Sequence, residues 1–564
     1  MYFDNASSIL YDSNLIDCLL KNSCNYANPH SLSNISQNTG NQIEMIRKKI
    51  LNYINADENI YTCVFTSGTT DSLKRIGEYF IWNNNTNYIY TIDNHTSVVG
   101  IREYALNKGS NVTVIDFNDN EEINELNIMM RQEYKINNNC DEKINLFSMP
   151  AESNFSGKYY KKDLINKIKK KYGNCLFLYD TAKYISSNNL DLSDNLIDFC
   201  TISFYKMFGY PTGLGALIIK KESIKYLNKY YFGGGTVNIS SSEKDYMISK
   251  NKFHEWMEDG SPNYLGIISL DNLLNSKVNS KYIHKLTYHF YNSIRNAKYS
   301  NGNNIFILYD IPLDYNYSEF CKNHGSIITF NLFKKNGDYF GYKEFEEICV
   351  LNNISIRTGC LCNTGACHKN LNISYDNLIY NLSKGHSCSE SVDLIDGKPT
   401  GVIRVSFCST NTISEINLFL EFININFIKY NFNNNIIDNS LITVSELNIY
   451  PIKSAQKQSV KSWPIVKNGL LYDRQWSLID SDNNVIRLKK CPNLINLYPY
   501  IDINSQDLII SYKNKNITID ISNNPEESII QQQCICTNYG YVYNNNINNW
   551  LSKQLGINCR LIRS

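Results

Sequence analysis

The chain has 564 residues, too many for one compact core, which predicts a multidomain protein. Lys and Arg number 55 against 54 Asp and Glu, and the net charge of +1 does not favour nucleic-acid binding. No apolar run reaches the roughly 18 residues of a membrane span, and the first ten residues lack a signal-peptide pattern. The 17 Cys therefore predict burial or thiol chemistry in a reducing compartment, and we expect a cytoplasmic protein without a disulfide framework.

Short apolar runs alternate with helical patterns from residue 61 onward. The helical pattern is clearest in KKDLINKIKKKYG, where Leu164, Ile165 and Ile168 repeat at helical spacing. This alternation predicts an α/β domain with a mostly parallel sheet, helices on both faces and ligands at the carboxyl ends of the strands. The expected strands are 61–66, 87–93, 111–117, 144–150, 175–180, 198–204 and 213–219.

The pattern changes after the Asn-rich residues 431–440. Residues 444–450, 476–488, 497–503, 507–512 and 516–521 alternate apolar and polar side chains, which favours antiparallel strands. We expect one domain over 1–430, a linker over 431–440 and a β-rich domain over 441–564. Asn clusters such as 83–85 and 544–546 favour loops.

Four features of the first domain suggest a cofactor site. Lys206 lies among Gly, Ser and aromatic residues in SFYKMFGYPTGLGAL, where burial would favour a neutral amine that can react with a carbonyl. A solvated lysine is the alternative for any single Lys. Asp180 ends an apolar strand and could pair with a protonated ring nitrogen or simply cap a helix. Gly68, Thr69 and Thr70 precede a helical pattern and could hold a phosphate, and His95 offers a flat ring.

Taken together over residues 2–430, these motifs resemble the fold-type I pyridoxal phosphate enzymes of the class V aminotransferase and cysteine desulfurase family. The resemblance implies a smaller C-terminal α/β subdomain and pyridoxal 5′-phosphate as cofactor. It implies that Lys206 links covalently to the cofactor, Asp180 pairs with its pyridinium and His95 stacks on its ring. It further implies a homodimer in which Ser261 of EDGSPN reaches the phosphate of the partner's site. The remaining cofactor contacts that it implies are Thr69, Thr70 and Ser203 at the phosphate and Asn154 near the phenol oxygen.

Several thiols lie in RTGCLCNTGAC, residues 357–367. With His368, His386 and Cys388 nearby, a zinc site is an alternative, but the spacing is not that of paired zinc knuckles and we expect no metal. A mobile loop would suit a sulfur carrier, because its thiolate must reach substrate sulfur and then an acceptor. The family resemblance places the catalytic cysteine at Cys362, while Cys360 and Cys367 stay open.

The last candidate site residue of the first domain is an arginine in GVIRVSF. The guanidinium of Arg404 suits a two-oxygen grip on an amino-acid carboxylate, although a surface ion pair is the alternative. The resemblance implies that the substrate is L-cysteine.

Two features separate this sequence from ordinary cysteine desulfurases. Tyr205 precedes the lysine where many desulfurases have His, and NIYPIKS, GLLYDRQW and LKKCPNL resemble a MOSC N-terminal β-barrel domain. This combination is similar to the eukaryotic molybdenum cofactor sulfurases, which implies sulfur transfer to the molybdenum cofactor for xanthine dehydrogenase and aldehyde oxidase. The alternatives are a plain cysteine desulfurase and an inactive scaffold. The presence of Lys206, Asp180 and Arg404 argues against the inactive scaffold.

The MOSC domain proper is expected after the barrel, and the sequence stops at Ser564. Three possibilities stay open: another chain supplies this domain, the sequence is a fragment, or the protein has lost that function. We expect weak binding of the molybdenum cofactor until such a domain is added. Basic residues of the barrel are candidates for contacts to anionic groups: Lys453, Arg474, Lys489 and Lys490.

Overall fold

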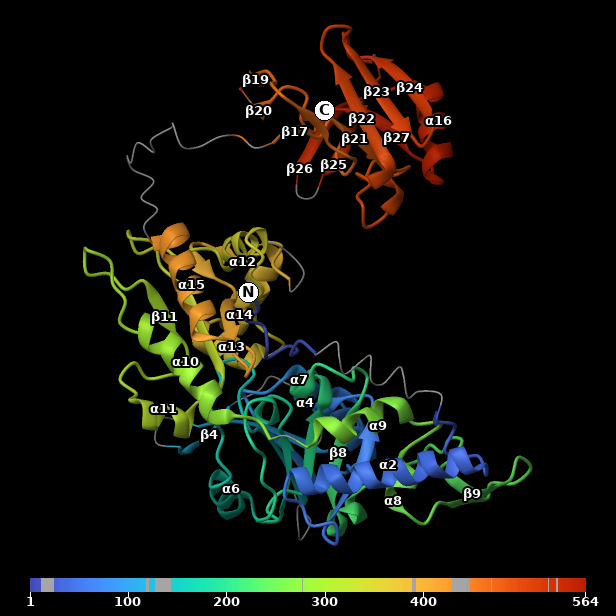
Figure 1. The fold of residues 1–564 in the computed structure, drawn as a ribbon, viewed down its shortest axis with the longest axis vertical. Helices are drawn as coiled ribbons and strands as arrows, with labels where there is room; N and C mark the ends of the chain where they lie inside the picture. The colour runs from blue at the N-terminus through green and yellow to red at the C-terminus, as the bar shows by residue number, and fades with distance from the viewer. Residues whose placement is uncertain are drawn as a thin grey trace. The chain divides into compact units, whose positions relative to one another are not determined.

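The computed structural model describes residues 1–11, 25–117, 121–126, 144–275, 277–387, 392–428, 444, 446–467, 469–525, 527–533 and 536–564. The chain forms two compact units, Met1–Asn431 and Phe432–Ser564 (Figure 1). The predicted linker at 431–440 and the predicted domain start at 441 lie outside the described residues. Among the described helices, none is long and apolar enough to span a membrane. The cytoplasmic location stays a prediction.

Unit 1 is built on a mixed eight-stranded sheet with the order β1-β8-β7-β6-β5-β2-β3-β4. Its central pairs, β7/β6, β6/β5, β5/β2 and β2/β3, are parallel, whereas β8 runs antiparallel to both β1 and β7. The seven strands predicted for this sheet are present, and β4, a half-exposed edge strand, is an addition. The bounds are β1 Tyr61–Thr66, β2 Thr86–Thr91, β3 Asn111–Phe117, β4 Ile123–Leu126, β5 Ile144–Pro150, β6 Cys175–Asp180, β7 Phe199–Ser203 and β8 Gly215–Lys220.

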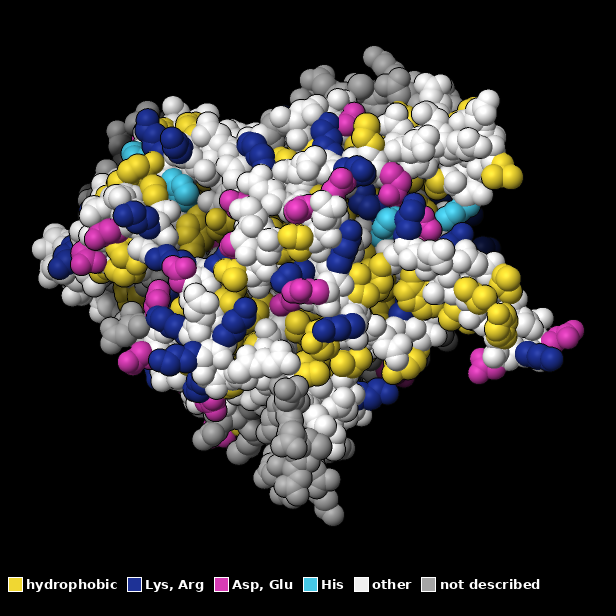
Figure 2. Space-filling view, turned by 90° about the horizontal axis from the view of Figure 1, so that it is seen from below, with side chains coloured by type: hydrophobic (Ala, Val, Ile, Leu, Met, Phe, Trp, Pro, Cys, Tyr) yellow, Lys and Arg dark blue, Asp and Glu magenta, His cyan; other side chains and the backbone are white. Residues whose placement is uncertain are grey.

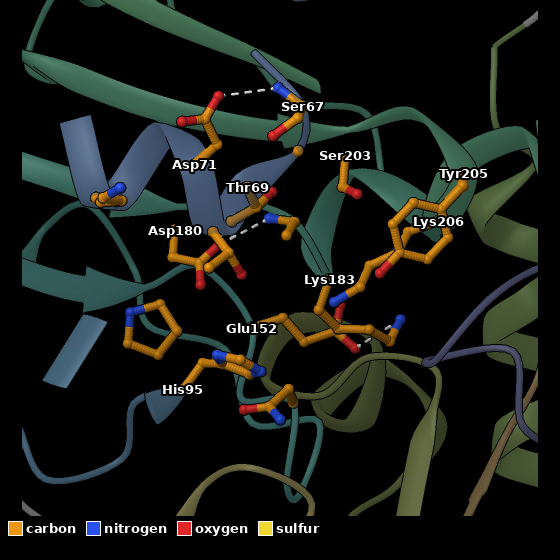
Figure 3. Close-up of a pocket in the computed structure, with 16 residues that line it drawn as sticks. Ser67, Thr69, Asp71, His95, Glu152, Asp180, Lys183, Ser203, Tyr205 and Lys206 are labelled. Carbon is orange, nitrogen blue, oxygen red and sulfur yellow. Dashed lines mark hydrogen bonds and ion pairs between the residues drawn. The ribbon is translucent and has the colours of Figure 1, made fainter. Parts of the chain in front are cut away.

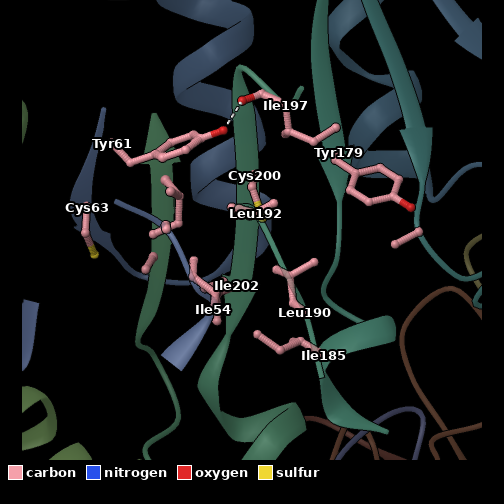
Figure 4. Packing of buried hydrophobic residues seen from close by; sticks show 14 of the residues in the cluster. Ile54, Tyr61, Cys63, Tyr179, Ile185, Leu190, Leu192, Ile197, Cys200 and Ile202 are labelled. Carbon is pink, nitrogen blue, oxygen red and sulfur yellow. Dashed lines mark hydrogen bonds between the residues drawn. The ribbon is translucent and has the colours of Figure 1, made fainter. Parts of the chain in front are cut away.

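Helices cover both faces of this sheet because successive strand side chains point to opposite sides. Cys63 and Phe65 of β1 belong to the same buried cluster as residues of α2 (Asn34–Tyr53), α6 (Leu164–Tyr172) and α9 (Tyr264–Leu273). Val64 packs on the other side with α3 (Thr69–Tyr79) and α5 (Ile101–Asn107). Figure 4 shows part of the first cluster, in which the Tyr61 hydroxyl donates to the carbonyl of Ile197 at 3.0 Å. The helix α6 matches the predicted helical pattern.

A smaller antiparallel sheet forms the C-terminal part of unit 1. Its order is β11-β12-β16-β13, and its core contains residues of α10 (Ser280–Ile294), α12 (Tyr342–Leu351) and α15 (Ile413–Ile423). The first residues of the chain join this part, since Phe3 donates to the carbonyl of Ser355 at 2.8 Å and accepts from the amide of Ser406 at 2.7 Å. The strands are β11 Phe306–Leu308, β12 Ile327–Leu332, β13 Arg357–Gly359 and β16 Val402–Ser406.

Unit 2 is rich in antiparallel strands. One sheet has the order β21-β27-β26-β25 and another the order β22-β23-β24, and both share a core with α16 (Asn545–Leu555). The prediction of a loop at 544–546 is wrong, because the Asn544 side chain accepts from the amide of Ile547 and caps this helix. The strands are β21 Trp476–Ile479, β22 Leu497–Asp502, β23 Asp507–Tyr512, β24 Lys515–Asp520, β25 Glu527–Gln533, β26 Cys536–Val542 and β27 Arg560–Arg563.

Two of the basic residues singled out in unit 2 have acidic neighbours. Arg474 pairs with Asp473 at 3.2 Å, and Lys490 pairs with Asp480 at 2.5 Å. These contacts partly neutralise the cations, so they weaken the expectation that Arg474 and Lys490 contact an anionic ligand.

Candidate active site

A cavity of about 480 Å³ lies at the carboxyl ends of the strands in the large sheet (Figure 3). Residues after β1, β2, β5, β6 and β7 contribute to it, as expected for a sheet whose strands end at one edge. The structure brings together eight of the predicted site residues in its lining: Gly68, Thr69, Thr70, His95, Asn154, Asp180, Ser203 and Lys206.

Lys206 enters the cavity from a one-turn helix, α7 (Phe204–Phe208), that follows β7 directly. No described residue forms a hydrogen bond with its Nζ. Burial lowers the pKa of Lys206, the cations Arg404 and Lys183 act in the same direction, and Asp180 opposes them. The structure therefore favours a neutral amine there, which can act as a nucleophile or a base.

Asp180 ends β6 and presents one carboxylate oxygen to the protein. Its Oδ1 accepts from the amide of Ala182 and from the hydroxyl of Thr201, each at 3.1 Å. Among the described residues, none donates to Oδ2. The carboxylate is thus held in place by one oxygen while the other can accept from a ligand.

The turn after β1 leads into the N-terminus of α3. Gly68 has φ of +146° and precedes Thr69, whose Oγ1 is buried without a hydrogen-bond partner in the described part of the chain. A Cβ on Gly215 of β8 would lie 2.6 Å from the Cα of Gly68, so this close approach requires glycine. The first amides of a helix lack intrahelical partners and attract anions, which makes this end of the cavity suited to a phosphate.

His95 caps the short helix α4 (Thr96–Val99) and also faces the cavity. Its Nδ1 accepts from the amide of Ser97 at 3.1 Å, which fixes the ring orientation. Burial lowers the pKa of His95, and the nearby Lys206 lowers it further. The ring is therefore neutral near pH 7.

Cys362 lies in a tight turn beside the cavity, exposed and free. Its carbonyl accepts from the amide of Thr96 at 2.8 Å, and the carbonyl of Leu361 accepts from Asn154 Nδ2 at 2.8 Å. Leu361 and Cys362 have φ of +61° and +54°, a left-handed conformation that is unfavourable for a leucine. These hydrogen bonds hold the turn on both sides, and the mobility that would suit a sulfur carrier stays a prediction.

The other two thiols of this segment are bonded to each other. Cys360 and Cys367 form a disulfide with their Cα atoms 5.2 Å apart, and Cys367 is buried. The sequence predicted neither this pairing nor any disulfide. In the described residues there is no group of three metal-binding side chains, and Cys388 of the zinc alternative lies outside them.

Arg404 of β16 is buried near the same turn. Its Nη1 donates to the carbonyl of Asn154 at 2.7 Å, and its Nη2 donates to Asp4 Oδ1 at 3.1 Å. Its Nε is buried without a partner in the described part of the molecule. An unsatisfied buried donor costs about 1–3 kcal/mol, so this atom is suited to bind a ligand.

Ser261 is not part of the cavity lining. It lies just before α9, and its Oγ accepts from Asn28 Nδ2 at 3.4 Å on the surface. Within a single chain, the structure therefore does not bring Ser261 to the other predicted residues.

Sequence reasoning missed a buried ion pair in the cavity wall. Lys183 Nζ lies 3.3 Å from Glu152 Oε1 and donates to the hydroxyl of Ser326 at 2.7 Å. The available signals were a lysine three residues after Asp180 and a glutamate two residues after the end of the buried strand β5. These bonds distinguish Lys183 from the unpaired Lys206 (Figure 3).

Asp93, which sequence reasoning also missed, is hydrogen-bonded to the turn that contains Cys362. Its Oδ1 accepts from Asn363 at 2.6 Å and from Ser153 at 2.8 Å, and its Oδ2 accepts from the Tyr160 hydroxyl at 3.0 Å. Burial, assisted by the charge of Asp310, raises the pKa of Asp93 from 3.8 to about 6.

This raised pKa predicts a pH dependence of stability. Between about pH 4 and pH 6 the folded chain keeps a proton on Asp93 that the unfolded chain has released, so the free energy of unfolding falls as pH rises through this window. The slope reaches at most about 1.4 kcal/mol per pH unit. Urea unfolding of wild type and Asp93→Asn should give stability profiles that diverge here, and parallel profiles would contradict the assignment.

Comparison with known sequences assigns both units to described families. Residues 1–419 match the aminotransferase class-V family and residues 441–558 match the MOSC N-terminal beta barrel domain. The chain is 34% identical to molybdenum cofactor sulfurase of Oryza sativa subsp. japonica over 617 aligned positions, which cover all of this chain and 74% of that protein. It is also 34% identical to molybdenum cofactor sulfurase of Bombyx mori, covering all of this chain and 77% of the relative.

Solved structures show the same fold for the first unit. A cysteine desulfurase from Thermococcus onnurineus NA1 superposes with a TM-score of 0.56 at 21% identity, covering 75% of this chain and 93% of that one. A cysteine desulfurase from Escherichia coli gives the same TM-score at 17% identity, with the same coverage. At these identities the likeness establishes the fold alone.

Proposed function

This chain belongs to the molybdenum cofactor sulfurase family, and from that premise we propose that it transfers sulfur from L-cysteine to the molybdenum cofactor. It is a pyridoxal phosphate-dependent sulfurtransferase. One observation carries the proposal. The turn with the exposed Cys362 is hydrogen-bonded, through Thr96, to the wall of the cavity that holds the unpaired Lys206.

The residues of the cavity fit pyridoxal 5′-phosphate. Thr69 has a buried hydroxyl without a partner among the described residues, and together with Gly68, Thr70 and Ser203 it would hold the phosphate at the N-terminus of α3. Asp180 would accept from the ring nitrogen through Oδ2, His95 would cover the ring, and Lys206 would bind the aldehyde carbon. When bound there, the cofactor supplies an electron sink for negative charge at the α-carbon of an amino acid.

Lys206 and Arg404 act on the substrate in this proposal. The guanidinium of Arg404 binds the carboxylate of L-cysteine, because it is buried and its Nε–H has no acceptor in the part of the chain that the structure describes. The Nζ of Lys206 accepts the proton from the α-carbon, which its lowered pKa favours. Arg404 comes from β16 of the small sheet, and its charge acts on Lys206 in the cavity at the large sheet.

Cys362 receives the sulfur. Its thiolate attacks the sulfur of L-cysteine, so a new S–S bond forms as the C–S bond of the substrate breaks. The electron pair of that C–S bond remains on the substrate, whose β-carbon takes up a proton. The α-carbon regains a proton from Lys206, and L-alanine leaves. The enzyme keeps a persulfide on Cys362, whose outer sulfur then passes to the molybdenum cofactor.

The function is tested by incubating the purified holoprotein with L-cysteine, once alone and once with desulfo molybdenum cofactor and a MOSC domain. We expect alanine in both mixtures and sulfurated cofactor in the second. Alanine without cofactor sulfuration in the second mixture would favour a plain cysteine desulfurase.

We further propose a two-fold homodimer whose second copy brings Ser261 to the partner's phosphate site. The exposed position of Ser261 outside its own cavity supports this arrangement. Apolar side chains also lie exposed on and before the β9–β10 hairpin (Val237–Ser240 and Met247–Ser249), which projects from the body in Figure 2. They are Tyr230, Tyr231, Phe232, Ile239, Tyr246 and Ile248.

Light scattering should give a particle of twice 65.1 kDa for the active protein. We expect the double variant Tyr231→Asp/Ile239→Asp to be monomeric and to bind pyridoxal phosphate more weakly, because charges disrupt the apolar contact and Ser261 of the partner is lost. Val350→Asp, at an equally exposed apolar position on α12, is the control and should stay dimeric. A monomeric mass for fully active wild type would disprove the dimer.

A further inference from the structure

The first eleven residues of the chain reach the arginine that is proposed to bind substrate. Asp4 Oδ1 accepts from Arg404 Nη2 at 3.1 Å, and the Ser7 hydroxyl accepts from the same nitrogen at 2.9 Å. The Ser7 hydroxyl also donates to Asp4 Oδ1 at 2.7 Å, which closes a three-membered network. Asp4 and Arg404 are both largely buried, with side-chain exposures of 13% and 4%.

This segment is anchored on both sides of the network. Phe3 is hydrogen-bonded to Ser355 and Ser406 through its backbone, and Asn5 Nδ2 donates to the carbonyl of Ser406 at 2.8 Å. Further along, the segment passes the end of the Lys206 helix so closely that a Cβ on Gly209 would lie 2.6 Å from the carbonyl oxygen of Ile9. Asp4 is therefore held in place by contacts with both parts of unit 1.

The hydrogen bonds leave a defined part of the guanidinium available. Arg404 has five N–H groups, and three of them are used by Asn154, Asp4 and Ser7. The Nε–H is buried and unpaired among the described residues. A buried donor without an acceptor costs folding free energy, and a ligand that accepts from it would remove that cost. Asp4 and Ser7 both bind Nη2, which lies in the same rigid guanidinium plane as Nε, so they help to determine where Nε points.

We propose that Asp4 is a positioning residue for substrate binding, which holds the guanidinium of Arg404 with its Nε–H directed to the carboxylate of L-cysteine. This inference rests on the proposed function of Arg404. Asp4 makes no contact with substrate. It acts through a charge-assisted hydrogen bond, and a buried arginine that loses its carboxylate partner does not keep its orientation.

The removal of Asp4 has two opposing effects on substrate affinity. It leaves Arg404 with more uncompensated positive charge, which would attract the substrate carboxylate. It also frees the guanidinium to turn toward other acceptors, including the backbone. We expect the loss of orientation to dominate, because the Nε–H that the proposal assigns to substrate must point at the carboxylate in order to donate to it.

The test compares Asp4→Asn with wild-type holoprotein. We expect KM for L-cysteine to rise about tenfold with kcat changed by less than about twofold, as for the loss of a binding interaction alone. Calorimetry with 3-mercaptopropionate, which has the carboxylate but no amine, should show a matching loss of affinity of about tenfold. Cysteamine, which lacks the carboxylate, should bind both proteins equally.

Three further variants define what the result means. Asp4→Glu should restore most of the affinity, Ser7→Ala should show a smaller loss, and the exposed Asp314→Asn should behave as wild type. If Arg404→Ala loses 3-mercaptopropionate binding while Asp4→Asn binds it as wild type, the inference about Asp4 is wrong and the role of Arg404 stands. If Arg404→Ala binds it normally, the proposed function of Arg404 fails first. A lower KM in Asp4→Asn would show that Asp4 competes with substrate and would overturn the inference.

Discussion

Lys206→Ala should lose alanine formation by at least about a thousandfold, because a positioned general base contributes 10²–10⁴-fold and its covalent hold on the cofactor would be lost as well. Burial lowers the pKa of both Lys206 and Lys183, and of these two only Lys206 has no hydrogen-bond partner among the described residues. The absorption of bound pyridoxal phosphate should shift to that of the free aldehyde. Wild-type turnover in this variant would exclude Lys206 as the catalytic amine.

The cavity is also lined by a second lysine, Lys183, against which the assignment of Lys206 as the reactive amine can be tested. Burial lowers the pKa of Lys183 as well and Glu152 opposes this, but its Nζ is bonded to Glu152 and Ser326, so we expect these bonds to keep it from reacting. Borohydride reduction of the holoprotein followed by peptide mapping should place the cofactor on Lys206. Lys183→Met is the matched control, and it should still be labelled on Lys206. A label on Lys183 in wild type would reverse the two roles.

Cys362→Ser should reduce alanine release to the level of a protein-free control while L-cysteine still binds. The reason is that substrate binding and proton removal depend on Arg404 and Lys206, whereas cleavage of the C–S bond needs the thiolate. Exchange of the substrate α-proton with deuterated solvent should therefore continue in the variant. Mass spectrometry of wild type should find one additional sulfur atom on the peptide with Cys362.

The neighbouring thiols provide the critical comparison. Cys360 and Cys367 are bonded to each other and Cys367 is buried, while Cys362 is free and exposed. Cys321, a half-buried free thiol outside this turn, is the control, and Cys321→Ser should keep wild-type activity. Recovery of the additional sulfur on Cys360 or Cys367 would contradict the assignment.

The sequence predicted the large sheet well because its strands are short, apolar and fully buried. The run CLFLYD became β6 with the bounds expected, and its last residue, Asp180, faces the cavity. The edge strand β4 was not predicted, because Ile123–Leu126 contains two charged or amide side chains and is only half-buried. Helix α16 escaped for a related reason, because its first turn consists of the same Asn residues that favour loops.

The site was predicted where its residues belong to local motifs. Lys206 and Ser203 lie in one motif and Gly68, Thr69 and Thr70 in another, and the parallel topology brings both to one edge. Pairs formed between distant segments could not be predicted in this way. Asp4 and Arg404 are separated by 400 residues, and nothing near either residue indicates the other. Their pairing depends on how the first residues pack against the small sheet.

The hydrogen bonds around Cys362 have a consequence for how sulfur could leave the site. The turn follows β13 of the small sheet, but its bonds come from Thr96, Asn154 and Asp93 next to the large sheet. A hinge rotation of the small sheet would break these bonds together and carry the thiol away from the cavity as part of a rigid body. Delivery to an acceptor would then require domain opening and not a flexible loop, so the transfer step would be gated by the same contacts that assemble the site.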